Sequence, residues 1–244
     1  MSIEPGEVSA AVVLPGTRSP LDPSRSLRTR RPSPTRGQVL DSQRGRLLDA
    51  GVQVVAEKGY EGASIQAICK QAGVAYNAFY ECFGSKDALL LAAYQEGTST
   101  ILAAVAAAYA HEDAWQDRVR ASISRFLHIL ADNTAFARFF AVEAQKIGSS
   151  LVDHLESTLL VAPTLFDDVS PAPGQSTDMR ELLAMVVGSI SAGVFVYLHT
   201  GREQRLLELE DNLVAFVSAV LTNVGPMARG PGEDRGQTQL RRRP

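Results

Sequence analysis

The sequence predicts an all-α protein in which a small unit of three helices precedes a larger helical body. Between residues 41 and 224, apolar side chains recur at intervals of three and four, and very little of the chain alternates as a strand would. Glycine, serine and aspartate interrupt this pattern where helices would end or begin. With 244 residues, 45% of them apolar and 21% charged, the chain suffices for one large domain or two modest ones.

The two ends of the sequence lack this helical period. Residues 1–40 are rich in proline, serine, threonine and arginine, and residues 225–244 have a similar composition. Segments of this kind bury too little apolar surface to fold by themselves. We therefore expect a disordered arm over 1–40, a first domain over 41–91, a helical domain over 92–224 and a disordered tail over 225–244.

Caps and glycines place the helices of the first domain. A helix is expected over about 43–58, with Gly59 as its C-terminal cap. Ser64 is a good N-cap for a second helix that ends at Gly73, and a third helix follows, with Phe79 and Phe83 on one face.

The body is expected to contain longer helices, at about 86–109, 113–131, 134–147, 149–168, 177–199 and 203–223. The helix over 177–199 is apolar nearly all round, so most of its surface must be covered. The last two helices could form a symmetric interface with a second copy, or they could close the core of a monomer. The sequence leaves both alternatives open.

Cys69, Gly73 and Phe79 follow a spacing that has a physical reason. The small side chain of Cys69 lets two helices approach closely, and Gly73 accepts the positive φ of a sharp turn. Phe79 then anchors the third helix, so that its opposite face is exposed and can enter a DNA major groove. This arrangement predicts a helix-turn-helix unit.

The stretch from Gly59 to Leu89 carries a more specific pattern, which includes Ala-Gly-Val, Phe-Tyr-x-x-Phe and Lys-Asp-x-Leu at fixed offsets. It resembles the tetracycline-repressor (TetR) family over about 50 residues, from Arg44 to Tyr94. The resemblance implies a helix-turn-helix DNA-binding domain followed by an all-helical ligand-binding and dimerisation domain. It also implies a homodimer that represses transcription at a palindromic operator in double-stranded DNA and responds to a small-molecule effector; activation instead of repression stays open, because it depends on the position of the operator. The two cysteines, which have no CxxC partner, fit a cytoplasmic location.

The resemblance assigns six residues to DNA contacts. Those matched to phosphate contacts are Ser64, Tyr80 and Lys86, and those matched to base contacts are Gln66, Tyr76 and Asn77. Hydroxyl and ammonium groups donate to phosphate oxygens, while Asn and Gln amides can pair with adenine. Each of these residues also occurs as an ordinary surface side chain, so the assignment depends on the surrounding motif.

Several features oppose strong DNA binding. Ala75 replaces the usual Ser or Thr cap of the third helix, and Glu81 places a carboxylate near the phosphates. Residues 41–91 hold five basic and six acidic side chains, which limits counterion release. Five arginines without an intervening acid precede the first helix and could compensate as a DNA-contacting arm: Arg25, Arg28, Arg30, Arg31 and Arg36. The alternative is a TetR-like ligand-binding or protein-interaction module with weak or lost DNA binding.

Other function classes find no support in the sequence. There is no paired carboxylate, catalytic triad, phosphate loop or metal-ligand spacing, so we expect no enzyme, cofactor or metal site. No apolar run is as long and unbroken as a membrane span requires. Cys69 and Cys82 are expected to be unreactive thiols, with a redox pair as the alternative. Four residues of the body are interpreted as core-edge side chains and not as sites: His128, Glu143, His154 and Met185.

Overall fold

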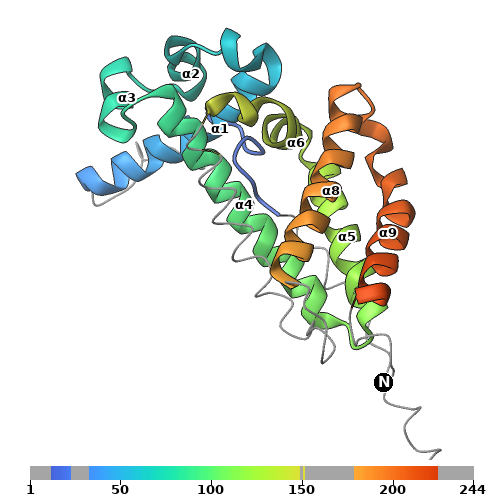
Figure 1. The fold of residues 1–244 in the computed structure, drawn as a ribbon. Coiled ribbons are helices and arrows are strands. Elements are labelled where there is room, and N and C mark those ends of the chain that lie inside the picture. Colours follow the sequence, from blue (N-terminus) through green and yellow to red (C-terminus); the bar gives the residue numbers. More distant parts are fainter. Residues whose placement is uncertain (1–11, 23–32, 149–150, 152–178, 225–244) are drawn as a thin grey trace, which may run out of the picture.

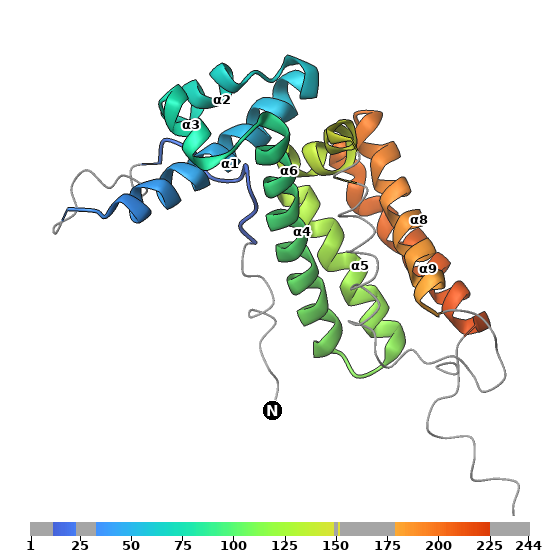
Figure 2. The same ribbon diagram turned by 60° about the vertical axis from the view of Figure 1, so that its left-hand side comes forward.

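The computed structural model of the chain describes residues 12–22, 33–148, 151 and 179–224 (Figure 1). Within these residues the chain forms helices and no strands, which confirms the all-α prediction. The first unit consists of α1 (Arg36–Gly62), α2 (Ile65–Ala72) and α3 (Tyr76–Cys82). The body contains the antiparallel pair α4 (Lys86–His111) and α5 (Trp115–Asp132), beside which lie α8 (Met179–His199) and α9 (Glu210–Val224) (Figure 2).

Helix α1 is longer than expected at both ends. It begins at Arg36, where a capping box fixes the first turn: the Thr35 hydroxyl accepts from the Gln38 N–H, and the Gln38 side chain accepts from the Thr35 N–H. Near its other end the helix is kinked at Gly59, whose φ is 74°. The glycine predicted as a cap therefore produces a kink, after which the chain continues to Gly62.

Residues 12–22 pack against α1 instead of forming part of a disordered arm. The Leu14 side chain is only 1% exposed, and the Gly16 N–H donates to the Asp49 carboxylate at 2.6 Å. The Gln53 amide donates to the carbonyls of Gly16 and Arg18 at 2.9 and 3.0 Å. The expectation of disorder over 1–40 is thus corrected for residues 12–22 and 33–40, because a buried carboxylate and an apolar contact hold the segment.

The part of the body after α5 departs from a single regular helix. The helix expected over 134–147 is divided into α6 (Thr134–Arg138), a π-helical turn η2 (Phe139–Glu143) and a 3₁₀ turn η3 (Ala144–Ile147). Likewise a 3₁₀ segment, η5 (Glu203–Leu209), precedes α9. The helix expected over 149–168, apart from Leu151, lies outside the described residues, as do the tail over 225–244 and the rest of the arm.

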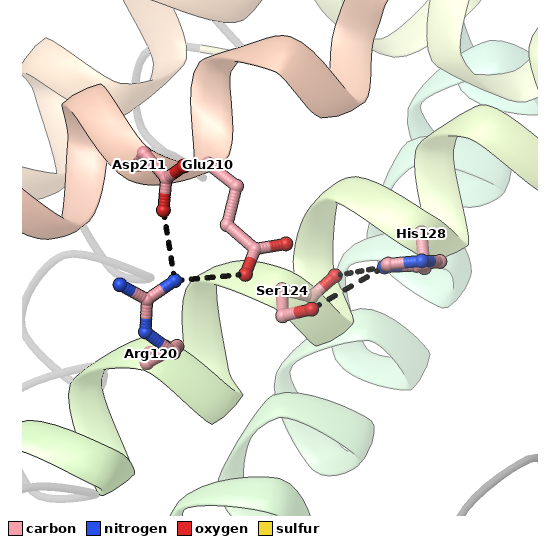
Figure 3. Close-up of polar contacts among 5 residues, drawn as sticks. All are labelled: Arg120, Ser124, His128, Glu210 and Asp211. Carbon is pink, nitrogen blue, oxygen red and sulfur yellow. Dashed lines mark hydrogen bonds and ion pairs between the residues drawn. The ribbon is translucent and has the colours of Figure 1, made fainter.

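Ion pairs and aromatic rings hold the body together. Arg120 of α5 pairs with Asp211 and Glu210 at the start of α9, at 2.9 and 3.4 Å, and both contacts are visible in Figure 3. In the same view His128 shares a hydrogen bond with the Ser124 carbonyl one turn back along α5, at 2.9 Å. Three rings of α6 and η2 cluster beside Tyr94 of α4; Phe136 and Phe139 are buried and Phe140 is half-buried.

Two helices are long and apolar enough to cross a membrane by length and composition, namely α4 and the part of α8 from Glu181 to His199. Core helices of globular proteins pass the same criterion. Helix α4 packs against both α1 and α5, which accounts for its apolar residues. Helix α8 instead leaves large apolar side chains exposed, including Met185 at 60% and Val196 at 49%. These exposed side chains of α8 therefore lack a cover among the described residues of this chain.

Candidate nucleic-acid interface

Ser64 and Gly73 define the two ends of α2, as the sequence predicted. The Ser64 hydroxyl accepts a hydrogen bond from the Ala67 N–H at 3.1 Å and so satisfies one of the free amides at the helix start. Gly73 ends the helix in the left-handed conformation with φ at 60°, which a side chain would oppose. The Val74 N–H then bonds the Cys69 carbonyl at 3.0 Å, and the chain turns into α3.

Helix α3 is held in place by its apolar face. Phe79 is 0% exposed and Phe83 is 5% exposed, which confirms their prediction as core residues. The guanidinium of Arg44 in α1 lies 4.5 Å from the centre of the Phe83 ring and covers it from outside. Because one face is anchored in this way, the opposite face of this short helix is directed toward solvent.

The exposed face of α3 carries three of the predicted DNA-contacting residues. Tyr76 and Tyr80 are 46% and 49% exposed, and Asn77 is exposed beside them. The two phenol hydroxyls lie 3.0 Å apart, one helical turn from each other. The hydrogen bond with Tyr76 raises the pKa of Tyr80 above its ordinary value.

Gln66 and Ser64 are also exposed, near the start of α2, whereas Lys86 differs from the other five. Lys86 is half-buried, and its ammonium donates to the Tyr60 carbonyl at 2.8 Å. The same ammonium lies 3.9 Å from the centre of the Tyr60 ring. An ammonium has three N–H donors, so two remain for other acceptors.

Tyr60 is itself fixed by the first turn of α4. Its hydroxyl donates to the Asp87 carboxylate at 2.6 Å, and this hydrogen bond, together with burial, raises the pKa of Tyr60 to about 12. The kinked end of α1 is thus attached to the start of α4 through Lys86 and Asp87.

The two departures from the family pattern have different structural consequences. Ala75 occupies the N-cap of α3 with extended backbone angles but supplies no side-chain acceptor, so this cap is absent. Glu81 pairs with Arg36 at 3.1 Å, in an exposed contact between the end of α3 and the start of α1. Arg36, which was predicted to belong to the arm, is thus a partner that offsets the charge of Glu81 near the DNA-facing surface.

Glu143 is a second residue whose position the sequence did not indicate. Its side chain is 6% exposed, and its Oε2 atom accepts from the Tyr60 N–H at 2.8 Å and from the Lys146 ammonium at 2.9 Å. Burial acts to raise the pKa of this carboxyl, but the hydrogen bonds from Lys146 and Tyr60 and the charges of Lys146 and Arg138 lower it overall. Its charged form therefore links the body to the first unit.

Cys69 and Cys82 are both free thiols, the first buried and the second half-buried. Burial raises the pKa of each thiol, which disfavours the reactive thiolate. These environments agree with the interpretation of both residues as unreactive.

The fold and this surface define a class of protein: a helix-turn-helix DNA-binding unit attached to an all-helical regulatory body. Residues 47–93 match the family model described as "Bacterial regulatory proteins, tetR family". The "Fatty acid metabolism regulator protein" of Bacillus subtilis is 22% identical over 183 residues, which cover 72% of this chain and 94% of that protein. The "HTH-type transcriptional activator FasR" of Mycolicibacterium smegmatis is 26% identical over 156 residues, which cover 62% of this chain and 69% of that protein.

A solved structure gives the same fold. The transcriptional regulator FadR from Bacillus subtilis, in complex with stearoyl-CoA, superposes with a TM-score of 0.58 at 20% identity, over 70% of this chain and 95% of that one. Residues 47–93 are therefore similar to the tetR family of bacterial regulatory proteins, and the fold of the chain is like that of the FadR structure.

Proposed function

We propose that the chain is a cytoplasmic, homodimeric repressor that binds a palindromic operator through α3 and responds to a small-molecule effector bound in its body. The observation that carries this proposal is the geometry of α3. Its apolar face is fully anchored through Phe79, while Tyr76, Asn77 and Tyr80 project from the opposite face into solvent. A helix held in this way can enter a major groove as a rigid unit.

The six residues have distinct roles in this proposal. Ser64, Tyr80 and Lys86 contact phosphates, because a hydroxyl or ammonium is a suitable donor to an anionic oxygen. Gln66, Tyr76 and Asn77 contact base edges, where an amide can pair with adenine and a ring can pack on the thymine methyl. The two copies of α3 would occupy successive major grooves about 34–36 Å apart.

Affinity measurements on variants of α3 test these roles. Tyr80→Phe removes one phosphate donor and should weaken binding to all sequences to a similar degree. Asn77→Ala should cost about 1–3 kcal/mol, or roughly 5- to 150-fold, on the best operator and relax the preference at one base pair. Tyr109→Phe, near the far end of α4, is the matched control and should bind as the wild type does. Equal reductions in affinity for Tyr109→Phe and Tyr80→Phe would contradict the assignment.

The homodimer is proposed from the exposed apolar faces of α8 and α9. Met185 and Val196 of α8 and Phe216 of α9 are 60%, 49% and 42% exposed, which is unusual for three large apolar side chains in neighbouring helices. A second copy packed on the same helices would cover them in a symmetric interface. Sedimentation analysis of Met185→Glu and Phe216→Glu should give monomers, and a wild-type monomer would contradict this part.

The effector is proposed to be a long-chain acyl compound such as an acyl-CoA. Two relatives support this class: one is named for fatty acid metabolism, and the FadR structure contains stearoyl-CoA. Stearoyl-CoA should raise the melting temperature and change operator affinity, whereas free CoA and acetyl-CoA should do neither. Equal responses to all three compounds would argue against recognition of the acyl chain.

The arginines before α1 provide a further test of DNA binding. Substituting Arg25, Arg28, Arg30 and Arg31 with glutamine removes their charge but retains residues 12–22 and the Arg36–Glu81 pair. If the arm binds phosphates, the slope of log affinity against log salt concentration should become shallower by about 0.9 for each phosphate that is no longer neutralised. An unchanged slope would show that the arm does not touch DNA.

One alternative has specific support: a TetR-like module for ligand or protein binding with weak or lost DNA affinity. The excess of acidic over basic residues in 41–91 and the uncapped start of α3 favour it. Under this alternative, stearoyl-CoA would still stabilise the body, while no duplex sequence would bind above the non-specific level.

A further inference from the structure

The backbone N–H and C=O groups of Tyr60, which belong to two adjacent peptide units, are hydrogen-bonded to residues of different parts of the chain. Its N–H donates to Glu143 of η2 in the body at 2.8 Å. Its carbonyl accepts from Lys86 at the start of α4 at 2.8 Å. Tyr60 follows directly after the kink at Gly59, where α1 changes direction. The backbone of a single residue therefore connects a buried carboxylate of the body to a lysine that the proposed function assigns to a DNA phosphate.

We propose that Glu143 is a positioning residue for DNA binding, which fixes Lys86 in its phosphate-contacting position through the backbone of Tyr60. This inference rests on the proposed DNA-binding function and goes beyond it, because Glu143 itself lies in the body and contacts no DNA. We refer to Glu143, Tyr60 and Lys86 together as the Tyr60 clamp.

Steric fit and burial both favour a fixed clamp. A Cβ atom built on Gly59 would lie 3.5 Å from Oε2 of Glu143, so the carboxylate lies directly over the kinked backbone. The kink itself requires a φ of 74°, which glycine adopts without strain. Since the Glu143 side chain is 6% exposed, water competes little for its oxygen atoms. Charge-assisted hydrogen bonds in such surroundings are stronger and more directional than exposed ones.

The second half of the clamp restricts Lys86. A lysine side chain has four rotatable bonds and loses much conformational entropy when it is ordered on a ligand. Here the Tyr60 carbonyl and the Tyr60 ring, 3.9 Å from the ammonium, order this side chain before DNA arrives. If the backbone of Tyr60 shifts, the Lys86 ammonium no longer contacts the Tyr60 carbonyl or ring. The side chain of Lys86 must then be ordered by the DNA phosphate alone.

Glu143 is also placed where changes in the body would reach it. It is the last residue of η2, whose first residues, Phe139 and Phe140, pack on Tyr94 of α4 with ring centres 6.4 and 5.1 Å away. π-Helical turns are rare and occur frequently at functional sites. A rearrangement of these rings would displace the turn that carries Glu143, and with it the backbone of Tyr60.

The salt dependence of operator binding tests the clamp, because a merely structural role of Glu143 would leave the number of neutralised phosphates unchanged. Four proteins are compared with the wild type: Glu143→Ala, Glu143→Gln, Lys86→Met and the double variant of Glu143→Ala with Lys86→Met. The matched control is Glu210→Ala, which removes an ion pair between α5 and α9 that includes none of the three residues of the clamp (Figure 3).

The clamp predicts that Glu143→Ala weakens operator binding about tenfold and makes the salt slope shallower by about 0.9, as Lys86→Met does. The salt slope of the double variant should equal that of either single variant. Glu143→Gln retains an oxygen that can accept from the Tyr60 N–H, so its salt slope should be close to that of the wild type. Glu210→Ala should match the wild type.

Two results would overturn the inference. If Glu143→Ala is folded and its salt slope equals that of the wild type, Glu143 does not position Lys86, whatever its effect on affinity. If the wild type binds no operator at all, the proposed function fails and the clamp fails with it, so the two failures are distinguishable. Far-ultraviolet circular dichroism identifies any variant that does not fold. If Glu143→Ala does not fold, Glu143→Met, which fills a similar volume but has no carboxylate to accept from the Tyr60 N–H, is judged by the same slope criterion.

Discussion

Truncation of Leu14 tests whether the segment before α1 is part of the folded unit. The Leu14 side chain is 1% exposed and packs against α1, while Gly16 and Arg18 are hydrogen-bonded to Asp49 and Gln53. Removing a buried leucine side chain to alanine typically costs about 2–5 kcal/mol. Because this segment lies at the edge of the core and can relax, we expect the lower end, about 2 kcal/mol.

In a protein of this size, about 2 kcal/mol corresponds to a fall in melting temperature of roughly 4–8 °C. Thermal unfolding followed by circular dichroism measures this difference. The matched control is Val13→Ala, because Val13 is the adjacent residue and is 47% exposed, so its change should stay within about 0.5 kcal/mol. Equal melting temperatures for Leu14→Ala and Val13→Ala would refute the packing and restore the disordered arm that the sequence suggested.

Three further predictions concern individual residues. Ala75→Ser should add the missing cap of α3 and stabilise the protein by about 1 kcal/mol in urea unfolding, whereas Ser64→Ala should remove a similar amount. Since the pKa of Glu143 is lowered by folding, its charged form contributes stability that is present above its unfolded pKa of about 4.3 and is lost as pH falls through the lower folded value. The stability advantage of the wild type over Glu143→Gln should therefore shrink between about pH 6 and pH 3, and a constant difference would contradict this. Gly97→Ala should cost about 1–3 kcal/mol, because the new methyl group would overlap the Phe136 ring, and an unchanged midpoint would show that the core yields easily.

The features that were predictable from the sequence depend on residues close together in the chain. The Ser64 cap, the Gly73 turn and the Phe79 anchor all lie within the same two helices, and helical spacing alone determines which face each side chain occupies. The family resemblance of the same stretch assigned Tyr76 and Tyr80 to DNA contacts, and both lie on one exposed face of α3.

The features that were missed depend on pairs that are distant in sequence. The Tyr60 N–H and Glu143 are separated by 83 positions, and Arg36 and Glu81 by 45, so no local pattern connects them. For Leu14 the composition of its surroundings suggested disorder, but one apolar side chain and one buried acceptor, Asp49, are sufficient to hold the segment. The π-helical turn at 139–143 similarly depends on tertiary packing that helical periodicity does not encode.

Selection of bound sequences from a random pool of DNA duplexes tests the central claim most directly. The wild type is compared, at low and at physiological salt, with a double variant that combines Tyr80→Phe and Lys86→Met. The account predicts that the wild type enriches a palindromic motif with half-sites about one helical turn apart, and that the double variant does not. Absence of any enriched motif with the wild type at either salt concentration would contradict the account and would favour the alternative of a helical module without DNA recognition.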